Sequence, residues 1–187
     1  GNIRYTHFGE GRYEETEKAI QQLLLEAGHL AVDEVVEVKE VAAGVEFGKI
    51  GTPEIYLGYL RINNLGNKDE KVLPGTVHTF LEPKDIEQNR FYFVGDWKIE
   101  PEYAEFTGGK GKLLIRYKAN KLNMVLDVKE GVSVPLELKL DGEDLRGVTI
   151  DSPGFYNFTD TGDEYDWHTL EIVIKALGLQ AFTFTFG

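Results

Sequence analysis

The sequence contains no cysteine among its 187 residues. This absence excludes disulfide bonds, thiolate metal sites and catalysis by a thiol nucleophile. Methionine is also scarce, with one residue. A chain of this length is one good-sized domain or a small domain with an appendage, and its core buries enough apolar surface that no covalent staple is required.

Positive charge and long hydrophobic runs are scarce as well. Asp and Glu number 32 against 20 Lys and Arg, which gives a formal net charge of -12. A field of that sign repels phosphate backbones and anionic membranes, so we expect no nucleic-acid partner. No apolar run approaches the roughly 20 residues that cross a bilayer. No signal-peptide pattern is present, and Gly1 is interpreted as an expression scar on a truncated parent.

The residues that are abundant favour a β-rich fold. The chain has 21 Gly and 12% aromatic residues. In the clearest strand, residues 134–140 (VPLELKL), every second residue is apolar, and Asp141-Gly142 then predicts a tight turn. Similar patterns predict strands at residues 54–62, 91–99, 113–117, 122–128, 170–174 and 181–186, the last with three Phe on one face. This spacing predicts an antiparallel β-sandwich or barrel.

One helix is predicted, over residues 13–27, with a short strand before it at residues 3–8. Gly28 is a natural stop for the helix. Its apolar residues fall on one helical face: Tyr13, Ile20, Leu23, Leu24 and Ala27.

These predicted elements divide the chain into three parts. A strand and one helix cannot close a hydrophobic core, so we interpret residues 1–28 as the end of a domain whose body is missing. Residues 29–53 are expected to form a connector with one short strand at residues 35–41. Residues 54–187 are expected to form the sandwich.

Four segments resemble one family. Residues 7–17 (HFGEGRYEETE) resemble the last strand and last helix of the TlpA/DipZ class of thioredoxin-like domains. Three further segments resemble, in the same order, the C-terminal domain that follows thioredoxin in DipZ-like proteins: residues 52–59 (TPEIYLGY), 97–104 (WKIEPEYA) and 181–187 (AFTFTFG). The resemblance covers most of the chain from Thr52 onward.

The resemblance implies a fold, a parent protein and a setting. The fold is a mainly β, antiparallel jelly-roll β-sandwich of the galactose-binding or carbohydrate-binding-module type, preceded by the last strand and helix of a truncated thioredoxin fold. The parent is an extracytoplasmic, membrane-anchored thiol–disulfide oxidoreductase with a CcdA-like part and a role in cytochrome c biogenesis. The family's Cys-x-x-Cys motif and cis-proline are not in this sequence, so we expect a non-catalytic, redox-inert module.

A sugar site needs an aromatic platform and polar groups that bond hydroxyls. Trp97 lies within a strand pattern and is expected in the core, whereas Trp167 is either a platform or a buried wedge. An isolated Arg near aromatic residues is more often structural than ligand-binding. The other candidate platforms are Tyr156 and Tyr165, with Tyr56, Tyr59 and Tyr103 also available, and the candidate hydrogen-bond donors are His168, Arg61 and Arg90.

Metal binding and catalysis have little support. Residues 160–166 (DTGDEYD) place several carboxylates on one loop, as a Ca²⁺ site requires, but an exposed acidic turn is the commoner interpretation. No hydrolase, nucleotide-binding or zinc-protease motif occurs. The four His show no ligand spacing: His7, His29, His78 and His168. We therefore expect no cofactor and no enzymatic activity.

Two functions remain open. The first is a module that binds a carbohydrate or a similar polar ligand and so places the parent enzyme on an envelope glycan. The second is a protein–protein module that orients the thioredoxin domain of the same parent chain, or that forms a homodimer through the predicted helix.

Overall fold

A computed structural model describes residues 2–6, 13–28, 47–67 and 72–187 of the chain. The chain divides into two compact units, residues 1–45 and 46–187, and each is described by itself. The short strand expected at residues 35–41 lies outside the described residues. Within these ranges, no helix combines the length and the apolar character needed to cross a membrane.

The N-terminal unit contains the predicted helix, α1 (Tyr13–Glu26). The helix ends as predicted, because Ala27 donates its amide to the Leu23 carbonyl and Gly28 takes a positive φ of 82°. Residues 2–6 have no regular secondary structure, so the strand expected from residue 3 is not formed over that part, and the remainder of it lies outside the described residues. Arg4 instead donates two hydrogen bonds, of 2.6 and 2.8 Å, to the Glu26 carboxylate.

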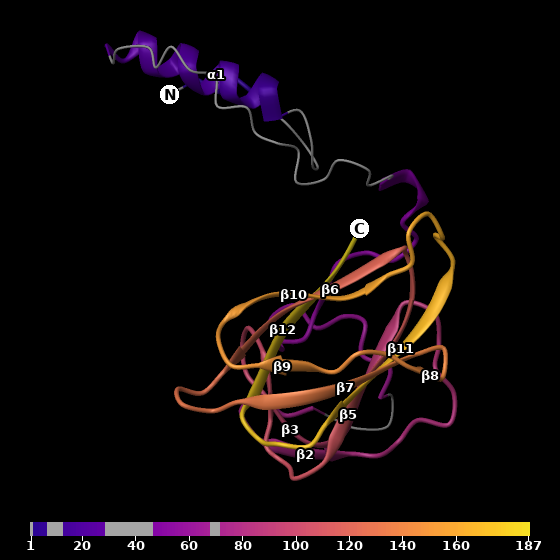
Figure 1. The fold of residues 1–187 in the computed structure, drawn as a ribbon. Coiled ribbons are helices and arrows are strands. Elements are labelled where there is room, and N and C mark those ends of the chain that lie inside the picture. Colours follow the sequence, from indigo (N-terminus) through magenta and orange to yellow (C-terminus); the bar gives the residue numbers. More distant parts are fainter. Residues whose placement is uncertain (1, 7–12, 29–46, 68–71) are drawn as a thin grey trace. The chain divides into compact units, whose positions relative to one another are not determined.

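The second unit is a sandwich of two antiparallel sheets, as predicted (Figure 1). A 3₁₀ turn, η1 (Phe47–Lys49), precedes it. The first sheet runs β10 (Gly154–Asp160), β6 (Lys121–Val128), β12 (Leu179–Phe186), β4 (Ala104–Phe106) and the second half of β3 (Arg90–Ile99), with β1 (Ile55–Tyr56) beside β12 and β2 (Val77–Phe80) beside β3. The second sheet runs the first half of β3, β5 (Gly111–Lys118), β11 (Trp167–Ile174) and β7 (Val134–Leu140), with β8 (Glu143–Asp144) and β9 (Val148–Ile150) beside β7.

Strand β3 joins the two sheets. Its residues up to Val94 pair with β5, and its residues from Gly95 pair with β2 and then β4. Gly95 lies at the change of sheet with a φ of 88°, a left-handed conformation that a residue without a side chain adopts readily. Trp97 is fully buried and donates its indole N–H to the Val94 carbonyl at 3.0 Å, which confirms the prediction that it belongs to the core.

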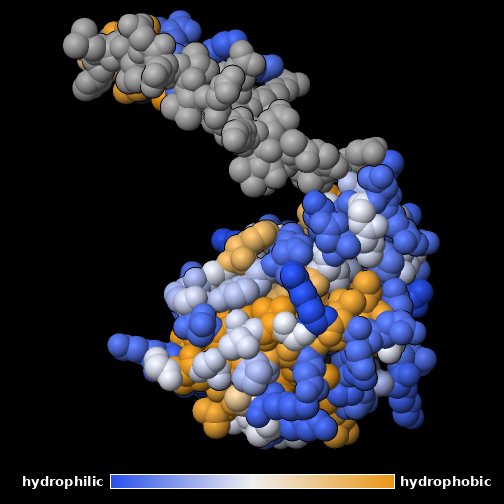
Figure 2. All heavy atoms as spheres, viewed as in Figure 1, coloured by the Kyte–Doolittle hydropathy of each residue, from blue (hydrophilic) through white to orange (hydrophobic). Residues whose placement is uncertain are grey.

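Inward-facing side chains from both sheets fill the core. In β6 and β7 the buried positions alternate with more exposed ones, as the sequence pattern predicts. Polar side chains cover much of the outside, and hydrophobic residues gather over the region where β7 and β9 lie (Figure 2). The largest fully buried side chains are Trp97, Tyr117, Phe80, Phe91, Phe93, Phe106 and Phe184.

Turn chemistry was predicted correctly at one hairpin. Asp141 and Gly142 connect β7 to β8 with positive φ values of 51° and 88°. Two positive φ values in succession form a type I′ turn, which matches the twist of the flanking strands.

The strand predicted at residues 54–62 is much shorter, because the chain leaves β1 after Tyr56 and turns at Gly58.

The last strand contains a bulge that the sequence pattern did not predict. The pairing of β12 with β6 shifts register between Ala181 and Thr183, so Phe182 is an extra residue on β12. Phe184 is fully buried in the core, and Phe182 is only partly buried and lies outside the core cluster. The prediction of three Phe on one face is therefore wrong for Phe182.

Candidate ligand-binding pocket

A break in the pairing of β12 creates the pocket. The first part of β12 pairs with β4, and the part from Thr183 pairs with β1 on the same side. Between these two short partners, Leu57 donates its amide to the Phe182 carbonyl at 2.9 Å. Phe182 therefore lies between the part of β12 that pairs with β4 and the part that pairs with β1.

Two turns lie beside this junction and are hydrogen-bonded to each other. The amides of Tyr59 and Leu60 donate to the carbonyls of Glu100 and Pro101, at 3.0 and 3.1 Å. The turn after β1 closes on itself because Arg61 donates its amide to the Gly58 carbonyl at 3.1 Å. The turn after β1 is thus fixed onto the turn between β3 and β4.

The space enclosed by these parts has a volume of about 230 Å³. Its lining combines aromatic and aliphatic side chains with one cation and one carboxylate. The lining residues are Tyr56, Gly58, Leu60, Arg61, Pro101, Glu102, Phe182 and Thr183. A largely apolar concave surface with a few polar groups is the usual composition of a small-molecule site.

Gly58 is required by a close approach of two backbones. A Cβ at this position would lie 2.3 Å from the Glu102 carbonyl carbon and 2.5 Å from the Pro101 oxygen. Backbone atoms cannot swing away as a flexible side chain can, so any larger residue would push the two turns apart.

Arg61 is held in place by an aromatic ring. Its guanidinium carbon lies 4.7 Å from the centroid of the Tyr56 ring, a cation–π contact. Tyr56 in turn donates its hydroxyl to the Glu54 carboxylate at 2.8 Å, and this hydrogen bond raises the pKa of Tyr56. Arg61 is exposed, it also interacts with the Tyr56 hydroxyl, and among the described residues no carboxylate forms an ion pair with it.

The opposite side of the pocket is apolar with a carboxylate at its rim. Phe182 packs against Tyr103, with ring centroids 5.2 Å apart, and Leu60 is 67% exposed. Glu102 is exposed and has no ion-pair partner among the described residues. A ligand in this pocket therefore meets an apolar wall, a row of hydrogen-bond donors on Arg61 and an acceptor on Glu102.

Of the six main candidates for ligand binding, Arg61 lines this pocket, and so does Tyr56, which was predicted as a further aromatic platform. Trp167 and His168 lie at the start of β11, in the other sheet, and Trp167 is partly buried. His168 is 7% exposed, and its Nδ1 lies 2.8 Å from the Asp141 carboxylate. Its Nε2 is buried without a hydrogen-bond partner. The structure thus places this imidazole in the interior, where the sequence predicted a donor to a ligand.

The other three predicted residues also lie elsewhere and make local contacts. Tyr156, on β10, donates its hydroxyl to the Ser152 carbonyl at 2.6 Å. The Lys49 ammonium lies 5.5 Å from the centroid of the Tyr165 ring. Arg90, on β3, donates to the Asn63 carbonyl at 3.2 Å. The structure does not bring these side chains together.

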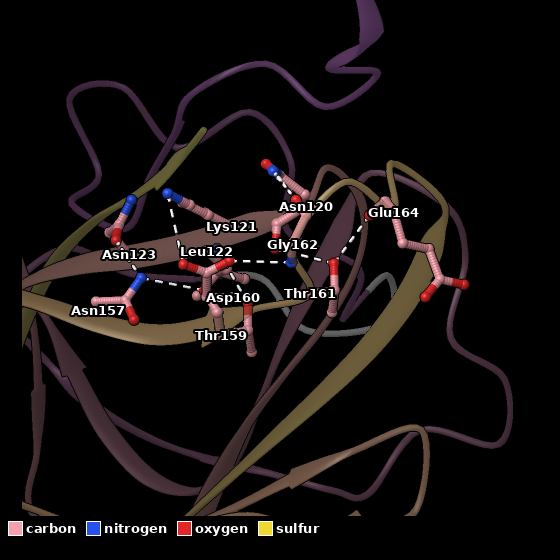
Figure 3. A network of polar contacts seen from close by, with 10 residues as sticks. All are labelled: Asn120, Lys121, Leu122, Asn123, Asn157, Thr159, Asp160, Thr161, Gly162 and Glu164. Carbon is pink, nitrogen blue, oxygen red and sulfur yellow. Dashed lines mark hydrogen bonds and ion pairs between the residues drawn. The ribbon is translucent and has the colours of Figure 1, made fainter. Parts of the chain in front are cut away.

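The acidic loop is organised by its own hydrogen bonds (Figure 3). The Asp160 carboxylate accepts the Gly162 amide at 3.0 Å and lies 3.5 Å from the Lys121 ammonium. Thr161 donates to a carbonyl of the loop, and Asn120 donates to the Gly162 carbonyl. Across the described ranges, no group of three or more His, Cys, Asp or Glu is placed to hold a metal ion.

The sequence did not predict Phe182, Pro101 or Glu102 as pocket residues. A signal was present nevertheless. Each of the three segments that resemble the DipZ C-terminal domain supplies part of the lining: Tyr56 and Gly58 from residues 52–59, Pro101 and Glu102 from residues 97–104, and Phe182 and Thr183 from residues 181–187.

Comparison with known proteins gives a family and two relatives. Residues 52–187 match the family described as the thioredoxin-like C-terminal domain. The whole chain is 27% identical to the protein DipZ of Mycobacterium bovis and to that of Mycobacterium tuberculosis, and it spans 26% of the length of each. Among solved structures, a family two carbohydrate esterase from Cellvibrio japonicus aligns with 58% of this chain and 32% of its own, at 13% identity and a TM-score of 0.46.

Proposed function

The chain belongs to the thioredoxin-like C-terminal domain family, and from this premise we propose that it is a non-catalytic, ligand-binding module of a larger thiol–disulfide oxidoreductase. The relatives named DipZ are about four times as long, so the remaining chemistry would belong to other parts of such a protein. Disulfide exchange needs a thiolate, and this chain contains no cysteine.

The ligand that we propose is a carbohydrate, bound in the pocket between β1, β12 and the turn after β3. The observation that carries this proposal is the convergence of the three family-like segments on one pocket that has an apolar wall, one cation and one carboxylate. A pyranose ring offers C–H groups to the side of an aromatic residue and hydroxyls to donors and acceptors. Phe182 and Arg61 supply these two kinds of contact.

The setting is part of the same proposal. We propose that the module is extracytoplasmic, as part of a membrane-anchored parent similar to the relatives named DipZ. By binding an envelope glycan in its pocket, the module would place the parent beside that glycan. The net charge of -12 repels such a module from anionic phosphates.

Titration calorimetry of the whole chain against cell-wall and common oligosaccharides tests the function. We expect at least one saccharide to bind, and Arg61→Ala and Phe182→Ala each to weaken it by tenfold or more, about 1.4 kcal/mol. Arg90→Ala is the matched control, because Arg90 is an arginine on β3 outside the pocket. A panel without any binder, or binding that neither pocket variant weakens, would contradict the proposal.

A second candidate function is protein contact through α1. Four aliphatic side chains of this helix are between 41% and 52% exposed, which is unusual for a helix that has a partner. The exposed residues are Ile20, Leu23, Leu24 and Leu25. We propose a second copy of the chain as the partner. Light scattering that finds a monomer at all concentrations, with an N-terminal unit that proteases remove readily, would sink this candidate.

A further inference from the structure

Three neighbouring strands of the second sheet place basic side chains on its outer face. Arg116, on β5, is the register partner of Arg90 on β3 and of Thr169 on β11. Two residues further along β5, Lys118 pairs with Trp167 on β11. The strand residues next to these five in sequence are buried, so the five share the face that points away from the core. We call these five residues the basic face.

The basic face offers hydrogen-bond donors and almost no acceptors. Arginine, lysine and tryptophan side chains only donate, and a threonine hydroxyl also donates. Arg90 and Arg116 are directly opposite each other, an arrangement of like charges that lowers stability. Among the described residues, no carboxylate forms an ion pair with Arg90, Arg116 or Lys118. The fold therefore gains no charge compensation for placing these three cations together.

The carboxylates that border the basic face have other partners. Asp141 accepts the amide of Thr169 at 2.7 Å, and Asp166 accepts the backbone amide that follows it. Glu171 lies 3.5 Å from the Lys112 ammonium, further along the same strands. The anion that would balance the three cations is thus not supplied by the part of the chain that the structure describes.

Two of the three cations are held in position by the protein. Arg90 donates from its guanidinium to the Asn63 carbonyl at 3.2 Å. The stem of Lys118 lies against Gly51, because the Gly51 amide donates to the Lys118 carbonyl at 2.8 Å and a Cβ on Gly51 would lie 2.9 Å from the Lys118 Cδ. Side chains that are restrained in this way lose little conformational entropy when a ligand binds.

From the donors, the missing counter-charge and the restraint, we propose that the basic face binds an oxyanion, namely the carboxylate, sulfate or phosphate group of a small ligand. Arginine suits such a group because a guanidinium donates two parallel hydrogen bonds to its oxygens. The net charge of -12 does not prevent binding, because physiological salt screens charges that lie more than about 8–10 Å away. The basic face shares no residue with the pocket beside β1, so the proposal does not rest on saccharide binding.

An anion titration of the whole isotope-labelled chain, followed by NMR, tests the proposal. The probes are sodium acetate, sodium sulfate and sodium phosphate at constant ionic strength, with sodium chloride as the reference salt. We expect at least one oxyanion to shift the Trp167 indole signal and the Arg116 and Thr169 amides with saturation, at a concentration about tenfold or more below any effect of chloride. Trp97 is the internal reference, because it is fully buried and its indole N–H is bonded to the Val94 carbonyl.

Variants that remove one charge test the residues. Arg116→Gln and Arg90→Gln are each expected to weaken the oxyanion about fivefold or more, because each removes a guanidinium. Arg146→Gln is the matched control, since it removes the same charge from an exposed arginine between β8 and β9, and it is expected to leave the affinity unchanged. The amide spectrum of each variant shows that it folds, and either of the two basic-face variants is sufficient for the test.

The outcomes separate this site from general screening and from the pocket. Saturable binding that only the basic-face variants weaken would support the proposal, and the tightest of the three probes identifies the group. Shifts that grow linearly with every salt, or equal weakening by Arg146→Gln, would overturn it. Because the probes contain no sugar, either outcome leaves the proposed function standing, and Arg90→Ala remains the control for uncharged saccharides at the pocket.

Discussion

Arg61 forms no ion pair with a carboxylate among the described residues, in a chain where acidic residues outnumber basic ones by 32 to 20. Several carboxylates elsewhere on the sandwich are paired with lysines, as Glu100 is with Lys98 and Glu105 is with Lys129. Tyr56 holds the guanidinium instead, and Glu54 holds the tyrosine. Stacking on Tyr56 restrains the guanidinium, so a ligand that binds there removes little side-chain entropy.

At the same scale, Tyr117 is expected to make the unfolding free energy of the sandwich fall at alkaline pH. Burial raises the pKa of Tyr117 to about 12, above the ordinary value of 10. Because the folded-state pKa is the higher one, the stability that the neutral phenol contributes is fully present below pH 10. It is lost as the pH rises through about 12.

We therefore expect the wild type to lose about 2 kcal/mol more unfolding free energy than Tyr117→Phe between pH 9 and pH 11.5. Urea unfolding of both proteins at the two pH values measures the difference, and the comparison cancels the titration of other groups. Equal losses in the two proteins would show that the phenol is not buried as described.

Some residue positions could be predicted from the sequence and others could not. Trp97 lies in a strongly alternating, aromatic segment, and this local pattern is sufficient to place it in the core. His168 follows an acidic loop, and its burial depends on Asp141, which is 27 residues away in the sequence. A contact between distant segments leaves no local pattern, so sequence reasoning assigned this side chain to the surface.

At the scale of elements, the pocket depends on short strands that interrupt a regular sheet. Strand β12 has β4 and β1 as successive partners on one side and a bulge on the other, and Phe182 lies at this position. Bulges re-aim side chains and are common next to binding sites. Here the bulge separates Phe182 from Phe184, so that one ring lines the pocket and the other fills the core.

The close contact between the two turns predicts what a substitution of Gly58, in the turn after β1, does to stability and binding. Gly58→Ala places a methyl group against the backbone of residues 101 and 102, so we expect a loss of roughly 1–3 kcal/mol in stability together with a loss of saccharide binding. Gly109→Ala is the control, because a Cβ there meets no atom within 4 Å. Denaturant unfolding and calorimetry measure both effects, and a Gly58→Ala variant that behaves like the control would contradict the described contact.

The long strands were predictable for a physical reason that the short ones lack. Strand β6 and the first part of β7 bury alternate residues, and β5, β11 and β12 do so over part of their length, which leaves a period of two in the sequence. Strands β1, β4, β8 and β9 contain only two or three residues each, so pairing with distant partners and not local sequence defines them. The pocket is lined by β1, by the turns after β1 and after β3, and by β12, so the pairing of distant segments and not local sequence brings its parts together.

On the scale of the whole molecule, the sandwich has a complete core of its own. Every residue of the buried cluster lies between Ile55 and Phe184, and the hydrophobics packed against it lie between Ile50 and Phe186. The division of the chain into residues 1–45 and 46–187 agrees with this distribution.

We therefore expect residues 46–187 to fold without the N-terminal unit. Their unfolding free energy should match that of the same transition in the whole chain within about 0.5 kcal/mol, because the buried cluster lies entirely within these residues. Denaturant titrations followed by tryptophan fluorescence report this transition, since both Trp97 and Trp167 lie in the sandwich. A loss of cooperative unfolding in the shortened chain would mean that the N-terminal unit contributes to the core.

The measurement that tests the central claim most directly is an amide chemical-shift titration of the isotope-labelled chain with the tightest-binding saccharide. The account predicts that the largest shifts fall on the residues around the joined turns and the bulge: Tyr56, Gly58, Arg61, Glu102 and Phe182. Shifts confined to Tyr165, Trp167 and the acidic loop would place the ligand at the other site that the sequence suggested, and would contradict the account.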